Sequence, residues 1–438
     1  MDNSNGEVLT GVVVAWESPS KKTSILTNTY GLYSLSIPAE AGTIRVQILG
    51  YTPFTQSIKA GREAIKLNVR LKEESFELGE VAVQGQRKLD NNVKTTEMSV
   101  STLSSKEIKK IPQLLGETDI VRTLTLLPGV STVGEASNGF NVRGGNADQN
   151  LILLDEAPVY SSSHLFGFFS IFNADAVRDV TLYKGGMPSN YGGRLSSVLD
   201  VRQKEGNSER YAAQGGIGLL SSRLTVEGPL VKQKASFMVS GRRSYFDLFL
   251  PYTGNLELQN TKIYFYDLNA KVNATLSDKD RVFASMYFGR DQFGAQDLFD
   301  FGWGNWTSTL RWNRIVNAKL FFNATAVYSD YTYSLGTPED AVPSFKLDSR
   351  IQNTVTNLGW TYYANTRHKI DWGVQNTYYV FSPGQITGAF DIELRQEFAT
   401  EPAIFVSDDI KVSDKLSITA GLRYSGFANL GKRRVFSY

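Results

Sequence analysis

Residues 263–276 read IYFYDLNAKVNATL, and this stretch decides the fold class because two kinds of side chain alternate along it. Apolar residues occupy the even positions from Tyr264 to Leu276, and mostly polar residues occupy the odd positions between them. A period of two places successive side chains on opposite faces of a β-strand. The stretch therefore predicts a strand with one apolar face and one polar face.

The same alternation recurs through residues 209–438, most clearly at 319–328 and 415–425. We count about eleven such segments, each long enough to form a strand. Their connections alternate in length, with short turns near 277–280, 364–367 and 412–415 and longer loops near 291–304, 335–344 and 382–390. Outer-membrane β-barrels have this rhythm of short turns and long loops. A soluble sheet with one solvated polar face is the alternative.

The composition excludes several classes of function. The chain has 438 residues, a net charge of +2, two His and no Cys. Without Cys there can be no disulfide framework, Cys-ligated metal site or Cys nucleophile. The near-zero net charge gives no general attraction to nucleic acid. We therefore expect no enzyme, and neither catalytic residues, a metal site, a cofactor nor a nucleic-acid partner.

Three further regions precede the alternating segments. Residues 1–72 contain short strand-like runs separated by turns, which predicts a small β-sandwich. Residues 73–104 are polar and charged, with one apolar island at Val81–Val83, and predict a linker. Residues 105–208 combine helical spacing with strand-like runs and pairs of glycines, which predicts an α+β domain.

Two segments of the α+β domain carry a family resemblance. FNVRGGNADQNLILLDEAPVY at 140–160 and DVTLYKGGMPSNYGGRLSSVLDV at 179–201 resemble the plug-domain signatures of TonB-dependent outer-membrane receptors of the Bacteroidota type. Glu156 and Thr181 depart from the pattern, since the family often has Gly and Glu there. The signature residues are Arg143, Gly144, Gly145, Asp155, Lys184, Gly185, Tyr191, Gly192 and Arg194.

The resemblance implies a mostly β architecture in four parts. Residues 1–72 would be a carboxypeptidase-regulatory-like β-sandwich that lacks its first strand, and 73–104 a linker. Residues 105–208 would be the plug, and 209–438 the N-terminal half of a 22-stranded outer-membrane β-barrel. The resemblance further implies a location in the cell outer membrane and a chain truncated at both ends, without its signal peptide.

The implied function is import of a nutrient ligand, driven by displacement of the plug. The partners would be a TonB-type energy-transducing protein of the inner membrane, outer-membrane lipid, the unknown nutrient and, in some such receptors, a surface lipoprotein. Glu80, Val81, Ala82 and Val83 are the candidate TonB box, because an extended segment in a linker suits strand addition to a partner's sheet. A signalling receptor of the same fold and a soluble β-rich adhesion or binding module are the alternatives.

Other residues are candidates for contact with the ligand or the barrel wall. His164 lies in an aromatic stretch that can face a ligand, although a packed His is the simpler interpretation. Trp303 and Trp306 belong to an aromatic cluster that can stack on a ligand or anchor the chain at the membrane interface. We expect Arg143, Lys184 and Arg194 to contact the polar lumen wall, and the neighbouring glycines to allow tight turns and close approach to that wall.

Overall fold

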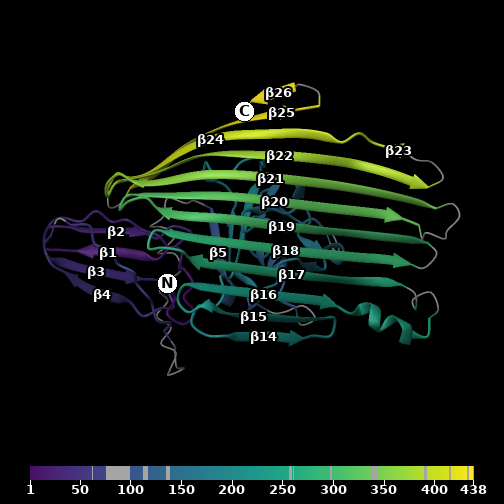
Figure 1. The fold of residues 1–438 in the computed structure, drawn as a ribbon, viewed down its shortest axis with the longest axis horizontal. Coiled ribbons are helices and arrows are strands. Elements are labelled where there is room, and N and C mark those ends of the chain that lie inside the picture. Colours follow the sequence, from purple (N-terminus) through teal and green to yellow (C-terminus); the bar gives the residue numbers. More distant parts are fainter. Residues whose placement is uncertain are drawn as a thin grey trace.

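The chain folds around one large antiparallel sheet that curves about a smaller mixed domain (Figure 1). The structure is a computed structural model. It describes residues 1–61, 63–74, 99–111, 117–134, 139–255, 259, 261–295, 298–337, 344–388, 392–413, 416–431 and 434–437. Among these residues no helix is long and apolar enough to cross a membrane.

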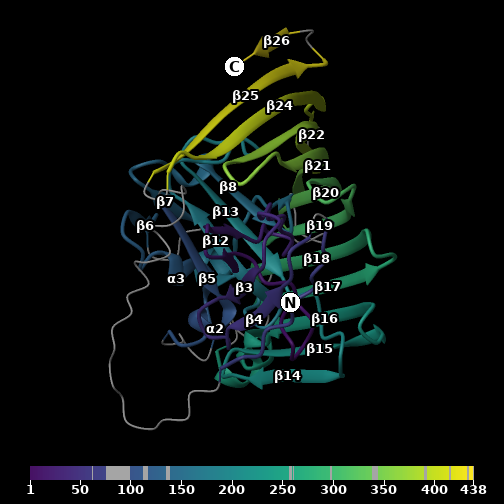
Figure 2. The ribbon, with the colours of Figure 1, turned by 90° about the vertical axis from the view of Figure 1, so that its left-hand side faces the viewer.

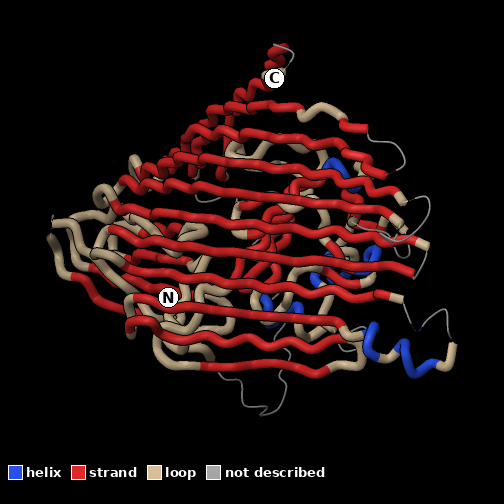
Figure 3. The backbone as a smooth tube through the Cα atoms, turned by 45° about the vertical axis from the view of Figure 1, so that its right-hand side comes forward, coloured by secondary structure: helices blue, strands red, loops and turns tan. Residues whose placement is uncertain are grey.

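The large sheet runs in chain order from β14 to β26, with the short β23 pairing beside β22. The tube in Figure 3 shows how far strands dominate this part of the chain and how short its helices are. The bounds of its strands are β14 (Ala212–Ile217), β15 (Ser221–Val231), β16 (Ala235–Ser244), β17 (Lys262–Thr275), β18 (Asp280–Ala295), β19 (Phe299–Ile315), β20 (Leu320–Gly336), β21 (Phe345–Tyr363), β22 (His368–Gly388), β23 (Ile392–Glu393), β24 (Glu397–Lys411), β25 (Ser417–Asn429) and β26 (Arg434–Ser437). The 3₁₀ helices η3 (Phe246–Leu248) and η4 (Leu250–Thr253) follow β16.

The two faces of this sheet confirm the alternation predicted from residues 263–276. On β17, Asp267 and Lys271 point toward the enclosed domain and are 3% and 2% exposed. Leu268 and Val272 point the other way and are 38% and 40% exposed. A wall that is polar inside and apolar outside is the reverse of a soluble protein, and it suits a lumen on one side and lipid on the other.

A five-stranded mixed sheet in the order β5-β12-β13-β8-β9 forms the enclosed domain, which we call the plug. Strands β8 and β13 are parallel, and the other neighbours are antiparallel. Its strands are β5 (Val100–Ser104), β8 (Asn150–Leu154), β9 (Ala157–Pro158), β12 (Val177–Tyr183) and β13 (Ser197–Gln203), accompanied by the two-stranded pairs β6 (Val130–Thr132) with β7 (Phe140–Val142) and β10 (Ser163–His164) with β11 (Phe169–Ser170). Its helices are α2 (Ser105–Ile108), α3 (Ile120–Leu124), η1 (Ala147–Gln149) and η2 (Leu165–Gly167).

The plug begins earlier than the sequence predicted. Residues 100–104 were expected to belong to the linker, but they form β5, which pairs with β12 along its full length. Leu103 packs against the main plug core, and the Thr102 hydroxyl lies 3.1 Å from that of Thr181. The edge strand is too short and too polar to be distinguished from a linker by periodicity alone.

Residues 1–74 form the N-terminal domain, whose sheet has the order β2-β1-β3-β4. These strands are β1 (Val13–Glu17), β2 (Lys22–Leu26), β3 (Gly42–Gln47) and β4 (Phe54–Ile58). Two of the strand-like runs in this region, LYSLSIP at 32–38 and AIKLNVRLK at 64–72, form no strand longer than an isolated bridge. Their side chains Tyr33, Leu35, Ile37, Leu67 and Val69 nevertheless pack on the same apolar core around Trp16.

The N-terminal domain lies at the short-turn end of the large sheet, in front of the plug in the end-on view of Figure 2. The Ser208 amide donates to the carbonyl of Asn5 at 2.8 Å. The Lys66 ammonium donates to the carbonyl of Asp278, in a short turn of the wall, at 3.0 Å. The domain therefore touches both the wall and the segment that joins the plug to it.

Candidate functional site

Charged side chains of the plug and the wall meet in a buried interface. The tight turn between β8 and β9 consists of Asp155 and Glu156, which have φ angles of 47° and 73°. Asp155 accepts a hydrogen bond from the Lys271 ammonium on β17 at 3.0 Å. Glu156 accepts one from the Arg311 guanidinium on β19 at 2.8 Å. One turn of the plug thus holds two neighbouring regions of the wall.

These pairs keep both carboxylates charged. Burial by itself would raise the pKa of Asp155, but the nearby Lys271 and Arg311 outweigh it and leave the pKa below its usual value. Burial would also raise the pKa of Glu156, which Arg311 and Arg202 lower in the same way. Buried ions of this kind are tolerated only when they are paired and hydrogen-bonded. The plug therefore depends on the wall for its charge balance.

A second contact is centred on His164, which is 1% exposed. Its Nδ1 lies 2.7 Å from a carboxylate oxygen of Asp291, and its Nε2 lies 3.1 Å from one of Asp267. The ring stacks on Phe265 with centroids 4.2 Å apart. Burial opposes the charged ring, but the two carboxylates outweigh burial and raise the pKa of His164. The His164 ring thus bridges two wall strands, β17 and β18, through their carboxylates.

More of the interface lies around β15 and β16. Asp175 of the plug accepts a hydrogen bond from Arg223 on β15 at 2.8 Å. The Arg242 guanidinium on β16 donates to Asp267 at 2.6 Å and to the carbonyl of Ser170 at 2.7 Å. The plug is therefore held by ion pairs over a wide area of the wall, which would all have to break for it to move away.

The signature glycines occupy places where a side chain would not fit easily. A Cβ on Gly192 would lie 2.4 Å from the Arg423 side chain of β25, so this glycine allows the close approach to the wall that the sequence predicted. Gly144 has a φ of 81°, and a Cβ on its neighbour Gly145 would meet Ser196. Gly185 lies against Arg143, whose guanidinium would be 2.8 Å from such a Cβ.

The hydrogen bonds of the signature cations go to groups of the plug, whereas we predicted polar contacts with the wall. Arg143 donates to the Ser99 hydroxyl at 2.6 Å, and Lys184 donates to the carbonyl of Pro128 at 3.1 Å. Arg194 donates to the carbonyl of Gly193 at 2.9 Å. Arg143 and Lys184 leave from turns at the plug's own strand ends, so their nearest acceptors are plug backbone and hydroxyl groups.

Tyr191, another residue of the plug signature, also contacts other plug residues. The Tyr191 hydroxyl donates to Asp200 at 3.2 Å, and its ring packs 5.4 Å from that of Tyr183. Asp155 and Glu156, which do hold the wall, could be recognised in the sequence only as charged residues. Asp155 belongs to the signature, whereas Glu156 was noted as a departure from it, and neither was assigned a wall partner.

None of the three ligand-facing candidates presents an exposed side chain to the lumen, since Trp303 is 6% exposed and His164 1%. His164 is enclosed by its carboxylate partners. Trp306 lies on the outward face of β19 and is 47% exposed, as expected for a lipid-facing anchor. Trp303 lies on the lumen face, with its ring 5.0 Å from that of Phe166, a plug side chain that is 40% exposed. The candidate TonB box, Glu80–Val83, lies outside the described residues.

A buried carboxyl lies where the N-terminal domain meets the plug–wall junction. Glu7 accepts a hydrogen bond from the backbone N–H of Glu205 at 2.8 Å. Burial, with a smaller contribution from the nearby Glu205 carboxylate, raises the pKa of Glu7 to about 7, although Arg178 and Lys204 oppose the change. The docked domain therefore binds a proton that a solvated Glu would release.

We expect docking of the N-terminal domain to weaken as the pH rises. Because the docked pKa lies above the usual value of 4.5, the stabilisation is full below pH 4.5 and is lost as the pH rises through about 7. Spin labels on Ser24→Cys in the domain and Ala318→Cys in a short wall turn report the distance between them. The undocked population should be larger at pH 8 than at pH 6. Glu7→Gln should remove this difference, and a difference that survives in Glu7→Gln would contradict the assignment.

Family models match two parts of the chain. Residues 92–197 match the TonB-dependent Receptor Plug Domain, and residues 1–83 match the CarboxypepD_reg-like domain. No curated protein matches the sequence.

Solved receptors share the fold. A mutant of the ferric enterobactin receptor from Pseudomonas aeruginosa is 15% identical, with a TM-score of 0.57 over 75% of this chain and 57% of that one. The siderophore receptor PirA from Acinetobacter baumannii is 14% identical, with a TM-score of 0.59 over 78% of this chain and 58% of that one. The chain thus spans less than two thirds of the length of either receptor.

The two family matches cover the N-terminal domain and most of the plug. The plug match covers the turn that pairs with Lys271 and Arg311, and the solved receptors share the fold of about three quarters of the chain. Residues 92–197 are therefore a match to the TonB-dependent receptor plug domain that follows a match to the CarboxypepD_reg-like domain, and the sheet that encloses them has the fold of the solved receptors.

Proposed function

We propose that this receptor imports a nutrient across the outer membrane by energy-coupled displacement of its plug. The observation that carries the proposal is the plug–wall interface of buried ion pairs. A plug held by Asp155–Lys271 and Glu156–Arg311 blocks the lumen until work is done on it, because separating each pair exposes a charge in a buried place.

The energy would come from a TonB-type protein of the inner membrane. In this proposal Glu80–Val83 adds as a strand to that protein's sheet, and a pull on this segment reaches the plug through β5. Strand β5 is an edge strand that pairs only with β12 among the described residues, so tension on the preceding chain acts first on that pairing. Peeling of an edge strand would begin the displacement.

The ligand would enter from the long-loop end, where Trp303 and Phe166 meet. Phe166 lies 5.3 Å from Phe293 and 5.7 Å from Phe301, so the plug and the wall share one aromatic surface there. Stacking on such rings suits sugars, aryl groups and other flat or apolar faces. The similar solved structures include a siderophore receptor, a ferric preacinetobactin receptor and a copper transporter. That likeness concerns the fold, and our proposal leaves the nutrient unassigned.

Removal of the plug tests whether it occludes the lumen. Deleting residues 99–208 from the receptor should raise the passive permeability of receptor-bearing outer membranes to small solutes, because the polar lumen face of the wall would then be open. The measurement is solute influx into cells that carry equal amounts of each protein at the surface. Influx equal to that of the intact receptor would contradict an occluding role.

A further inference from the structure

Glu156 has a third partner, which belongs to the N-terminal domain. The Tyr30 hydroxyl donates to its carboxylate at 3.2 Å. The Tyr30 ring lies against two cations, with the guanidinium of Arg311 at 5.0 Å and that of Arg202 at 5.7 Å from its centre. Arg202 is also 3.8 Å from Glu156. One carboxylate therefore joins the N-terminal domain, the plug and the wall.

The backbone conformation of Asp155 and Glu156 at this junction is strained. Asp155 and Glu156 are successive non-glycine residues with φ angles of 47° and 73°, a region that favours Gly. A strained conformation persists only where surrounding contacts determine it, and such sites are often functional. Here the contacts are the ones made by the Glu156 side chain, which a Gly could not supply.

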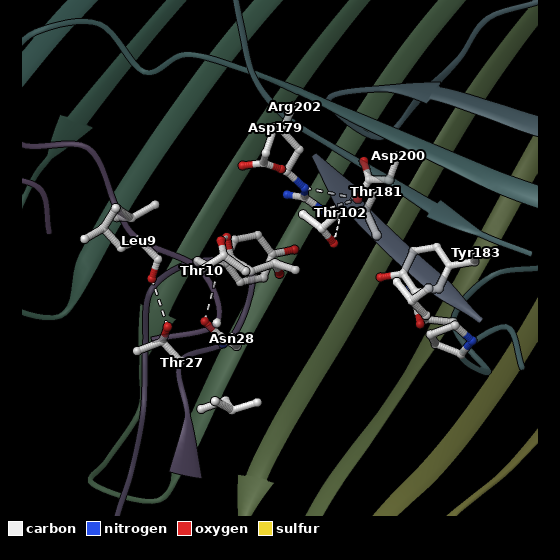
Figure 4. Close-up of a pocket in the computed structure, with 18 of the residues that line it drawn as sticks. Leu9, Thr10, Thr27, Asn28, Thr102, Asp179, Thr181, Tyr183, Asp200 and Arg202 are labelled. Carbon is white, nitrogen blue, oxygen red and sulfur yellow. Dashed lines mark hydrogen bonds and ion pairs between the residues drawn. The ribbon is translucent and has the colours of Figure 1, made fainter. Parts of the chain in front are cut away.

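The other contacts that dock the N-terminal domain on the plug are polar, and they lie outside the apolar cores of both domains. A cavity of about 3540 Å³ lies between the N-terminal domain, the plug sheet and the wall (Figure 4). Thr10 and Asn28 of the domain face it from one side, and Thr102 and Asp200 of the plug from the other. Among the described residues, the buried apolar clusters of the domain and of the plug share no side chain.

Discrete polar contacts across a cavity can open and close without disrupting either core. Burial, together with the Glu156 carboxylate, raises the pKa of Tyr30 to about 12. The Tyr30 hydroxyl therefore remains a hydrogen-bond donor. Each contact that docking makes with Glu156 also organises Arg202 and Arg311 around that residue. Docking and plug retention should therefore stabilise each other, since coupling between two sites is reciprocal.

We propose that the N-terminal domain is a latch on the closed plug, and that Glu156 is the positioning residue that couples the domain to the plug and the wall. In the latched state Tyr30 completes the environment of the Glu156–Arg311 pair. Release of the domain removes that support and lowers the work needed to displace the plug. The inference builds on the proposed plug movement, but its test requires neither a ligand nor an energy source.

The test uses distances within the intact receptor in outer membranes. The sequence contains no Cys, so two labelling pairs can be introduced without background. Spin labels on Ser24→Cys and Ala318→Cys report docking of the N-terminal domain. Labels on Asp148→Cys, an exposed plug residue, and Ala318→Cys report the position of the plug relative to the wall.

Tyr30→Phe keeps the ring against the two cations and removes only the hydroxyl. We expect it to raise the undocked population about tenfold, as for loss of a hydrogen bond to a charged group, and to broaden the plug–wall distances. Tyr33→Phe is the matched control, because the Tyr33 hydroxyl donates to the carbonyl of Leu67 within the N-terminal domain. It should leave both distance distributions as they are in the wild type.

A second variant separates the coupling from simple loss of a contact. Glu156→Met, which removes the acceptor oxygens, should undock the domain and loosen the plug, and adding Tyr30→Phe to it should cause little further undocking, because both changes remove the same hydrogen bond. The latch is overturned if Tyr30→Phe leaves the domain docked, or if the domain undocks while the plug–wall distances remain unchanged. Either result is independent of whether the receptor imports a nutrient, so failure of the latch and failure of the proposed function remain distinguishable.

Discussion

Lys271→Met should loosen the plug from the wall by about 3–5 kcal/mol, the usual cost of removing one partner of a buried ion pair. Lys271 is 2% exposed and donates to Asp155 and to the carbonyl of Gln203, both at 3.0 Å. The variant leaves the Asp155 carboxylate buried with only a backbone donor, the Gln203 N–H at 3.1 Å, as its direct hydrogen-bond partner. The closed state should therefore open more often.

A buried thiol measures this opening. Ala157→Cys places a thiol on β9, where Ala157 is 0% exposed and packs against Val327 and Val355 of the wall. A maleimide reaches it only when the plug separates from the wall. The expected loss of stability corresponds to a labelling rate roughly 100- to 4,000-fold faster in Lys271→Met, at about 1.4 kcal/mol per factor of ten.

Two controls show whether the charge is responsible. Lys22→Met removes a cation from an exposed pair with Glu17 and should change the rate by less than about threefold. Adding Asp155→Asn to Lys271→Met removes the stranded charge, and Asn tolerates the left-handed backbone at 155. That double variant should protect the Ala157→Cys thiol from maleimide nearly as well as the receptor that has Lys271 and Asp155. An unchanged rate in Lys271→Met would show that this pair does not hold the plug closed.

Periodicity predicted the wall because the pattern depends only on local geometry. Alternation along β17 fixes which side chains share a face. The connections were predicted less well, because the long loop expected near 291–304 is mostly strand, with β18 running to Ala295 and β19 beginning at Phe299. The same local rule failed at Asp155 and Glu156. As strand residues they would point to opposite faces, but they form a left-handed turn, and both carboxylates reach wall cations.

The wall partners could not be read from the sequence for a further reason. Lys271 is 116 residues from Asp155, and Arg311 is 155 residues from Glu156, so their pairing depends on how the plug sits in the lumen. Local patterns carry no information on that placement. Arg143 shows the opposite error, because a cation in a family signature suggested a wall contact, whereas its acceptor is Ser99 at the start of the plug.

Val81→Pro or Val83→Pro should abolish active import while leaving binding at the outer surface nearly unchanged. If Glu80–Val83 pairs as a strand with a TonB-type partner, its backbone N–H groups supply most of the affinity. Proline removes one such donor and is excluded from the interior of a paired strand. The proposed ligand contacts at Trp303 and Phe166 involve none of residues 80–83, so binding there should keep its affinity.

Val81→Ile is the matched control, because it keeps both the N–H donor and the β-branched shape that favours strands. Two measurements are made on the same cells: receptor-dependent nutrient uptake and surface binding of that nutrient. A third is capture of the receptor by the purified periplasmic domain of a TonB-type protein, which the proline variants should lose and Val81→Ile should retain. Because the latch contacts at Tyr30 and Glu156 involve none of these residues, the label distances of the resting receptor should not change. Proline variants that import at the normal rate would show that 80–83 is only linker, and the coupling segment would then have to lie elsewhere in 73–104.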